Sequence, residues 1–332
     1  MRQANFLMAV LALLACGSLL FASVVGSVAT PVPDLIAAFG EILRGQPSSL
    51  TATLLELRLG RALSAFVTGA ALSLAGVMMQ ALLRNPLADP YVLGVSGGAA
   101  VGALGAMLLF GAAWIVDAAA FGGAVVVALL LFLLARRDLR GGAEGSAPML
   151  LLTGVIVSSG CAALVTLMLS IAPENRLRGM VFWLIGDLSS TQPRLLPWLI
   201  WLAALGFALR MARAINVVAL YAEAAATLGI RVDRLRKGLF LCAALLTASA
   251  VSSAGSIGFV GLIVPHACRF AWGSDHRLLL PAATLAGGSF LVLADTLART
   301  VAAPQQLPVG VITALIGVPV FLLQLHHVQR RA

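Results

Sequence analysis

Long apolar segments recur along the whole chain and restrict the folds open to it. A helix that crosses a bilayer needs about 20 mostly apolar residues. Hydrophobic residues make up 61% of the 332 residues and charged residues only 11%, whereas soluble domains carry roughly 25% charged residues. We therefore predict an all-α, polytopic membrane protein, a single transmembrane domain over residues 1–332 with about ten transmembrane helices. The expected spans are 6–26, 62–83, 93–112, 114–135, 148–170, 195–213, 239–256, 257–271, 278–297 and 308–327.

The first span and the boundary between the seventh and eighth spans need a further argument. Segment 6–26 follows Arg2 as the core of a secretory signal would, but its apolar run is longer than a typical signal core, so we treat it as the first span. Only the Ser253–Ser256 stretch separates the seventh span from the eighth, which makes that boundary the least well defined.

Small residues are abundant in the spans, where alanine and many of the 33 glycines lie. Such small residues let helices pack closely in lipid.

The basic residues divide unequally between the two sides that ten spans define. The side carrying both termini holds 15 of the 22 basic residues and 6 of the 13 acidic ones, and the other side holds 7 of each. Cytoplasmic loops of membrane proteins carry an excess of Lys and Arg. The charge distribution therefore predicts that both termini are cytoplasmic.

Several functions are excluded by what the sequence lacks. Lys237 is the only lysine and lies outside any G-x-x-x-x-G-K-[ST] motif, so the chain has no P-loop nucleotide site. The net charge of +9 comes from arginines scattered between apolar segments, not clustered on one face as nucleic-acid binding requires. The four cysteines form no C-x-x-C pair and the four histidines no metal-binding pattern. We expect no nucleic-acid partner, no metal site and no cofactor in this chain.

Two functions of other classes stay open at this stage. The stretch GVSGG at 94–98 matches the G-x-S-x-G nucleophile elbow, but a proline-bearing loop precedes it instead of a strand. A tightly packed helix start explains it better than an intramembrane hydrolase using Ser96 and His266. A proton-coupled carrier needs buried acidic residues, and the span centres contain none. Asp295 lies near an outer helix end, four residues before Arg299, which favours a local ion pair.

The cytoplasmic loop 214–237 is the most informative loop. Alanine and leucine residues favour a short helix over 219–228, Gly229 is a typical helix end, and four basic residues follow within eight positions. Such a helix beneath the membrane bundle suits docking onto a cytoplasmic partner. A plain amphipathic connector with no partner would have a similar composition.

Motifs along nearly the entire chain resemble one family of transport proteins. In order, they resemble the permease subunits of the iron-chelate, haem and vitamin B12 importers, the type II importers among ATP-binding-cassette (ABC) transporters, which typically have ten spans per subunit. The motifs are LRLGR at 57–61, QALLRNPLADP at 80–90, GVSG at 94–97, GFVGLIVPH at 258–266 with Arg269, DHR at 275–277 with Leu280 and Pro281, LAD at 293–295 with Arg299, LPVGV at 307–311 and GVPVF at 317–321.

The resemblance implies partners, a location and a docking site. Two copies of the chain would form a pathway along their shared axis in the bacterial inner membrane. Two cytoplasmic ATPase subunits would bind ATP and Mg²⁺, and a periplasmic binding protein would deliver the substrate, so the chain itself would not be an enzyme. Arginines of this family dock the binding protein, and the matching positions are Arg58, Arg61 and Arg299. The alternative is a local role, in which these arginines pair with Glu56 and Asp295.

The resemblance also implies sites on the cytoplasmic side and inside the pathway. Asn85 and Leu87 resemble residues that close the pathway toward the cytoplasm. Because the fifth and tenth spans line the pathway in relatives, the candidate lining residues are Ser158, Thr166 and Thr313. The 219–229 segment resembles the coupling helices that fit a cleft on the ATPase, although Tyr221-Ala222 replaces a common Leu-Gly pair. Its expected contact residues are Ala219, Leu220, Glu223, Ala224, Ala225, Leu228 and Gly229.

The substrate is the least constrained part of this interpretation. Haem, ferric siderophores and cobalamin are bulky metal chelates carried by similar permeases, and the binding protein makes most of the selection. The expected lining is weakly polar, and the chain has five tryptophans and only two tyrosines, which suits a large, partly apolar macrocycle. We expect import of an iron complex, with haem favoured and vitamin B12 or a ferric siderophore as alternatives.

Overall fold

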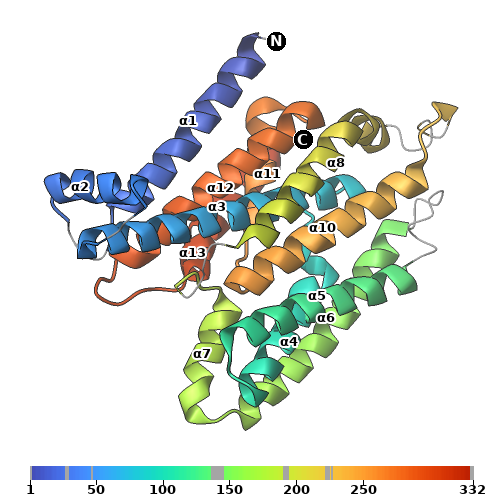
Figure 1. Cartoon of the computed structure of the whole chain (residues 1–332). Helices are drawn as coiled ribbons and strands as arrows, with labels where there is room; N and C mark the ends of the chain where they lie inside the picture. Colours follow the sequence, from blue (N-terminus) through green and yellow to red (C-terminus); the bar gives the residue numbers. More distant parts are fainter. Residues whose placement is uncertain are drawn as a thin grey trace.

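The computed structural model describes residues 2–26, 30–45, 48–135, 146–189, 194–220, 225 and 227–329 (Figure 1). Every regular element in these residues is helical, and seven of the described helices are long and apolar enough to cross a membrane, which confirms the predicted all-α, polytopic class. The elements are α1 (Arg2–Val24), α2 (Val32–Leu43), α3 (Leu50–Leu83), the 3₁₀ helix η1 (Pro90–Leu93), α4 (Val95–Leu109), α5 (Ala113–Leu134), α6 (Ser146–Ile171), α7 (Glu174–Ile185), α8 (Leu195–Leu220), α10 (Val232–Ala254), α11 (Val260–Trp272), α12 (His276–Thr300) and α13 (Val309–Gln329).

Ten of these helices correspond to the ten predicted spans, with some corrected bounds. Helix α3 begins at Leu50, well before the expected residue 62, and α8 continues to Leu220. Helix α11 begins only at Val260, because the backbone between α10 and α11 turns at Gly255 (φ +70°) and Phe259 (φ +71°). With 15 and 13 residues, α4 and α11 are shorter than the roughly 20 that cross a bilayer alone.

Two short helices were missed in the sequence, in the segments 27–61 and 171–194 that were expected to be loops on the outer side. Each of α2 and α7 has 12 residues and a proline as its N-cap residue, Pro31 and Pro173. Helix α7 is held to α4 by Arg176, whose Nη1 donates to the carbonyls of Met107 and Leu108 at 2.6 Å each. Such helices are too short to give a membrane-span signal, so their apolar faces merged with the neighbouring loops in the sequence pattern.

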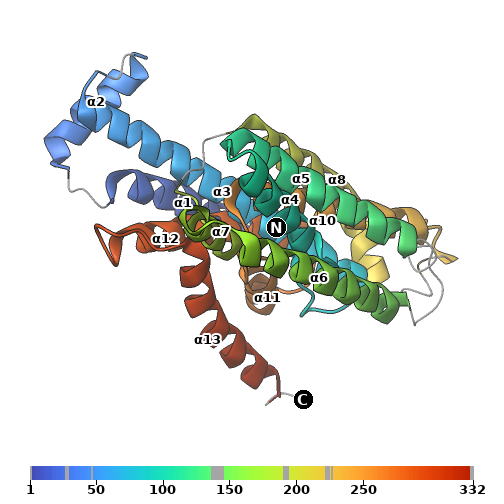
Figure 2. The same cartoon turned by 90° about the horizontal axis from the view of Figure 1, so that it is seen from below.

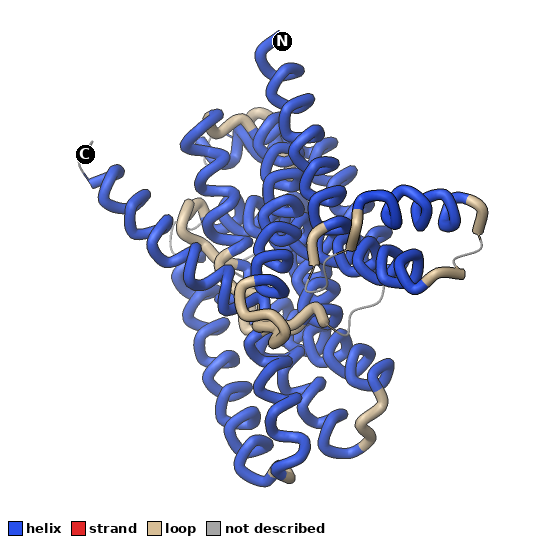
Figure 3. The backbone as a smooth tube through the Cα atoms, turned by 90° about the vertical axis from the view of Figure 1, so that its left-hand side faces the viewer, coloured by secondary structure: helices blue, strands red, loops and turns tan. Residues whose placement is uncertain are grey.

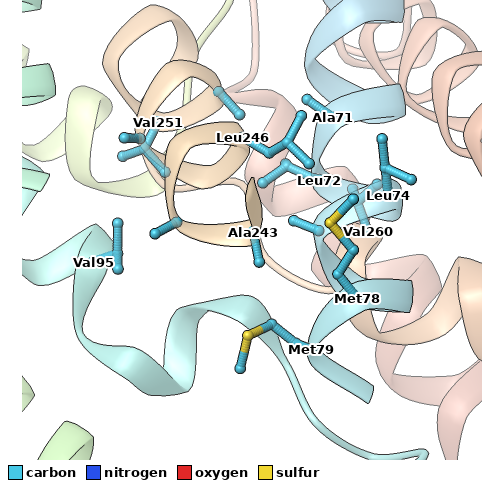
Figure 4. Packing of buried hydrophobic residues seen from close by; sticks show 14 of the residues in the cluster. Ala71, Leu72, Leu74, Met78, Met79, Val95, Ala243, Leu246, Val251 and Val260 are labelled. Atoms are coloured by element: carbon cyan, nitrogen blue, oxygen red, sulfur yellow. The ribbon is translucent and has the colours of Figure 1, made fainter. Parts of the chain in front are cut away.

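Helix α3 is the centre of the bundle. Its most apolar 18-residue stretch is 94% buried, the largest share among the candidate spans. It packs against α12, α10, α11, α8 and α1. Figure 4 shows Leu72 and Met78 of this helix among side chains of α10 and α11 that include Leu246 and Val260.

Helix α13 leaves this centre. It extends away from the bundle in Figure 2, and its main contacts among the described residues are with α12, α11 and α7. Figure 3 shows that α1 begins and α13 ends toward the same end of the molecule, as an even number of spans requires.

Glycines bring the backbone of α3 into direct contact with its neighbours. A Cβ atom placed on Gly76 would lie 1.8 Å from the carbonyl oxygen of Gly261 in α11, and one on Gly69 would lie 2.3 Å from that of Gly287 in α12. Both distances are far below van der Waals contact, so these positions tolerate only glycine without a backbone shift. Since lipid gives no hydrophobic drive for helix association, such close packing is what holds the bundle together.

Replacing Gly76 with alanine should therefore weaken the α3–α11 contact. The new methyl group would meet backbone atoms, which cannot rotate away as a flexible side chain would. Gly122→Ala in α5 is the matched control, because nothing lies within 4 Å of its added Cβ, and a helix-interior glycine costs about 1 kcal/mol relative to alanine. Thermal unfolding of the detergent-solubilised protein should show a melting temperature several degrees lower for Gly76→Ala and unchanged or higher for Gly122→Ala. Equal melting temperatures for the two variants would contradict this packing role.

Candidate functional site

A buried charged cluster joins α3 and α12 at the predicted outer side. Nε of Arg61 donates to both carboxylate oxygens of Asp295 at 3.1 and 3.0 Å, and its Nη2 donates to Oδ1 at 2.7 Å. Arg299, on the same helix as Asp295, adds a second ion pair at 3.5 Å. The Asp295 side chain is 1% exposed and that of Arg61 is 12% exposed. One carboxylate therefore holds two arginines that lie far apart in the sequence.

Arg299 and a third arginine, Arg58, also donate hydrogen bonds to the end of α1. Nη1 of Arg58 donates to the carbonyl of Val24 at 3.0 Å, and Nη2 of Arg299 donates to the carbonyl of Ala22 at 2.9 Å. The last four carbonyls of a helix have no partner within the helix. Arg58 and Arg299 thus supply hydrogen-bond donors to the last turn of α1 and fix that helix against α3 and α12.

This geometry bears on the predicted docking arginines. The alternative of local pairing is confirmed for Arg61 and Arg299 with Asp295, whereas Glu56 makes no ion pair among the described residues. Arg58 and Arg299 are only 8% and 5% exposed. The structure places the three arginines in one region, as expected, but buries two of them. Their contact with a binding protein stays a prediction.

The loop after α3, where the gate residues were predicted, is fixed by side-chain hydrogen bonds. Asn85 accepts a hydrogen bond from the backbone N–H of Leu87 at 2.9 Å, which forms a tight turn that leaves Leu87 42% exposed. Asp89 then caps η1 by accepting from the backbone N–H of Tyr91 at 2.7 Å. Asn85 and Leu87 lie at the surface of this loop, and their gating role stays a prediction.

Tyr91 in this loop connects two interruptions of the helical bundle, and the sequence analysis missed it. Its hydroxyl donates to the carbonyl of Ile257 at 3.0 Å and accepts from the Ile257 N–H at 3.1 Å. Ile257 lies in the non-helical link between α10 and α11. The loop that starts at residue 84 is thereby bonded to a segment about 170 positions later in the chain. A single sequence gives no signal for such a pairing.

The predicted coupling segment is described only in part. Helix α8 includes Ala219 and ends at Leu220, whose side chain lies outside the described residues, as do Tyr221, Ala222, Glu223 and Ala224. Ala225 is fully buried and Leu228 is 67% exposed. Gly229 has a φ of +76°, and the Ile230 N–H donates to the carbonyl of Ala225 at 3.1 Å. This is the helix-ending geometry expected at Gly229.

The predicted pathway residues fall in two different environments. Ser158 is partly exposed and Thr166 exposed on α6, the helix of the fifth span. Thr313 of α13 is instead fully buried, and its hydroxyl donates to the carbonyl of Gly310 at 3.0 Å. Thr313 thus lies inside the subunit, whereas Thr166, whose hydroxyl also bonds within its own helix, faces outward. The lining role of all three residues stays a prediction.

The stretch that resembled a nucleophile elbow begins a helix. Gly94 (φ +71°) follows η1 and is the N-cap residue of α4, so Ser96 lies in the first turn of a membrane helix and not on a strand-to-helix turn. This geometry removes the basis for the hydrolase interpretation. Among the described residues, no group of three or more His, Cys, Asp or Glu side chains could hold a metal ion.

The described residues form a polytopic helical membrane bundle with charged groups at its two ends, and comparison with known proteins shows the class of membrane protein to which it belongs. The model of the FecCD transport family matches residues 10–327, and the chain belongs to this family. It resembles the cobalamin import system permease protein BtuC of Halobacterium salinarum, with 41% identity over 308 residues, 91% of this chain and 81% of that protein. It also resembles the vitamin B12 import system permease protein BtuC of Escherichia coli O127:H6, with 36% identity over 277 residues, 80% and 81% of the two chains.

Two further similarities agree with this family. The ABC transporter permease protein YvrB of Bacillus subtilis, described as uncharacterized, is 38% identical over 318 residues, 90% of this chain and 87% of that protein. A solved structure of a metal-chelate type ABC transporter in an inward-facing conformation matches with a TM-score of 0.84 and 30% identity, covering 97% and 99% of the two chains. The chain is therefore a non-catalytic, multi-pass permease subunit of a type II ABC importer for iron chelates or vitamin B12.

Removing the Asp295 carboxylate should destabilise the bundle strongly. Deleting one partner of a buried ion pair costs about 3–5 kcal/mol, and Asp295→Ala would leave the buried guanidinium of Arg299 and the 12% exposed one of Arg61 without their carboxylate. Asp117→Ala is the control, because it breaks the ion pair between Asp117 and Arg194. The side chains of these two residues are 20% and 40% exposed, and exposed ion pairs contribute about 0–1 kcal/mol. Thermal unfolding in detergent should lower the melting temperature much more for Asp295→Ala. Similar losses in both variants would show that the buried cluster has no special stabilising role.

Neutralising Asp89 should stabilise the protein in a pH-dependent way. Burial raises the pKa of Asp89 from 3.8 to about 6, partly opposed by the hydrogen bond from the Tyr91 N–H. Because the folded chain holds this proton more tightly than the unfolded chain, its stability falls as the pH rises from 3.8 to about 6 and stays lower above that range. Asp89→Asn keeps an oxygen acceptor for the Tyr91 N–H and removes the charge.

We expect Asp89→Asn to raise the melting temperature at about pH 7.5, to lose about half of this advantage near pH 5 and to lose most of it near pH 4. Thermal unfolding of both proteins across this pH range is the measurement. An advantage that is absent at about pH 7.5, or equal there and near about pH 4, would contradict the burial of an ionised Asp89.

Proposed function

We propose that two copies of this chain form the membrane pathway through which a metal-chelating macrocycle passes from the periplasm to the cytoplasm. The observation that carries this proposal is the family match over residues 10–327. Two separate ATPase subunits would supply the energy by binding ATP and Mg²⁺, and a periplasmic binding protein would deliver the substrate. The lack of acidic residues in the span centres supports an external energy source over a proton-coupled carrier.

Among the metal chelates, cobalamin is the substrate that the relatives support best. Two of the similar permeases are named for cobalamin or vitamin B12 import, at 41% and 36% identity. Haem was favoured from the sequence only because the predicted lining is weakly polar, a property that suits either macrocycle. We therefore place cobalamin first and an iron chelate such as haem second.

The shape of the chain supports assembly with a second copy. The most apolar 18 residues of α6 are only 17% buried, and α13 extends away from the bundle (Figure 2). Exposed leucines and isoleucines follow both helices, and a symmetric partner would cover part of this surface. These residues include Leu152, Ile156 and Leu167 on α6 and Leu315, Leu322 and Leu323 on α13. Ser158 and Thr166 would then face the shared axis.

The remaining sites are assigned by the family motifs. Arg61, the most exposed arginine of the outer cluster, would contact the binding protein most directly, with Arg58 and Arg299 behind it. Segment 219–229 would contact the ATPase, and Asn85 and Leu87 would close the cytoplasmic end of the pathway. The excess of basic residues on the terminal side supports cytoplasmic termini in the bacterial inner membrane; protease access to a C-terminal tag in inside-out vesicles checks this orientation.

Affinity purification of the tagged chain from its native membrane should recover an ATPase at about one copy per permease. Proteoliposomes containing this complex and its binding protein should take up radiolabelled cyanocobalamin only when ATP is present, and a protonophore should have no effect. Omission of the binding protein is the control and should abolish uptake. Transport of haem or a ferric siderophore in place of cobalamin would correct the substrate alone. Uptake by the chain alone, driven by a pH gradient, would overturn the ATP-driven mechanism.

A further inference from the structure

A side chain in the last turn of α8 binds the start of α12 through three hydrogen bonds. Nδ2 of Asn216 donates to Oδ1 of Asp275 at 2.7 Å, and Oδ1 of Asn216 accepts from the backbone N–H of His276 at 2.9 Å. The same Oδ1 lies 2.7 Å from Nδ1 of the His276 ring. A single amide side chain thus engages both the side chain and the backbone of the turn between α11 and α12.

The partners of Asn216 are themselves held firmly. Asp275 is the N-cap residue of α12 and accepts from the Arg277 N–H at 3.0 Å. The hydrogen bonds from Arg277 and Asn216 lower the pKa of Asp275, which keeps its carboxylate ionised. His276 is 3% exposed. The N-cap hydrogen bond and the buried His276 side chain therefore give the end of α8 a defined attachment point at the start of α12.

The other end of the same turn is bonded to α3. Nη1 of Arg269, in the last turn of α11, donates to Oε1 of Gln80 at 2.9 Å, and Nε2 of Gln80 donates to the carbonyl of Leu262 at 3.3 Å. Gln80 is 3% exposed and lies one turn before the end of α3. A pocket of about 450 Å³ on the predicted cytoplasmic side adjoins the Gln80–Arg269 and Asn216–Asp275 contacts. It is lined by residues that include Gln80, Arg84, Pro86, Asn216, Ala219 and His276.

These contacts place the α11–α12 turn between two segments with assigned roles. The chain leaving α8 enters segment 219–229, and the chain leaving α3 enters the loop with Asn85 and Leu87. We infer that Asn216 is a positioning residue that ties the coupling segment to the α11–α12 turn, so that movement of this segment by the ATPase reaches the cytoplasmic gate through Arg269 and Gln80. This inference rests on the proposed function.

Loss of the Asn216 side chain should uncouple transport from ATP hydrolysis. In proteoliposomes with the full complex, Asn216→Ala should lower the number of chelate molecules moved per ATP hydrolysed by at least about fivefold. The amount of ATPase recovered with the chain and its basal hydrolysis rate should stay within about twofold of the wild-type values, since the side-chain hydrogen bonds of Asn216 go to Asp275 and His276 of its own chain. A purely structural role would lower assembly, hydrolysis and transport together, with the ratio unchanged.

Variants of Asp275 test whether this one contact carries the effect. Asp275→Asn keeps an oxygen that accepts from both Asn216 and the Arg277 N–H, so its transport ratio should remain close to wild type. Asp275→Ala removes that acceptor and should resemble Asn216→Ala, and the double variant should be no worse than either single one. Ser289→Ala is the matched control on α12, because its hydroxyl donates only to the Leu285 carbonyl of the same helix.

The possible outcomes separate this inference from the proposed function. A wild-type complex that moves no chelate with ATP overturns the proposed function and this inference with it. A wild-type complex that transports, together with an unchanged ratio in Asn216→Ala, overturns the positioning role alone. If Asn216→Ala does not yield folded protein, the isosteric Asn216→Asp takes its place: it replaces the donor to Asp275 with a second carboxylate, and a wild-type ratio in that variant equally overturns the inference.

Discussion

Backbone contact between helices at glycine is the constraint on which the rest of this structure depends. In lipid, apolar side chains gain little by leaving the solvent, so helices associate through close packing and a few hydrogen bonds. Gly76 against Gly261 and Gly69 against Gly287 bring α3 so near to α11 and α12 that no side chain fits between the backbones. Because these contacts fix α3 at the centre, the loops and charged groups at both of its ends acquire defined neighbours.

The polar groups of the chain are concentrated where the tightly packed region ends. At the predicted outer side, Asp295 pairs with Arg61 and Arg299, and two arginines provide donors to the last turn of α1. At the predicted cytoplasmic side, Asn216 and Gln80 bond the ends of α8 and α3 to the turn between α11 and α12. Buried polar groups are costly without partners, so each of these networks also determines which helix ends lie together.

The sequence was sufficient for the all-α, polytopic class and for the family, because these follow from long-range apolar patterns and from motifs read in order. It was insufficient for α2 and α7, whose 12 residues are too few to distinguish a surface helix from an apolar loop. It also could not show that Arg58 and Arg299 are buried. A resemblance assigns a role to a sequence position but does not say which residues surround that position in the fold. Asn216, Gln80 and Tyr91 were missed because their partners lie about 60 to 190 positions away.

The positions where the helices are interrupted explain how so closely packed a bundle could still change shape. Irregular backbone inside a membrane protein is tolerated only where it is buried in protein or lines a cavity. Here the loop after α3 and the link between α10 and α11 are such interruptions, and the Tyr91 hydroxyl satisfies both backbone polar groups of Ile257. Helices joined through glycine contacts would move as rigid units, so a change of access would have to occur at these links. The two segments that Tyr91 joins would then rearrange together, because separating them would leave the N–H and the carbonyl of Ile257 without partners.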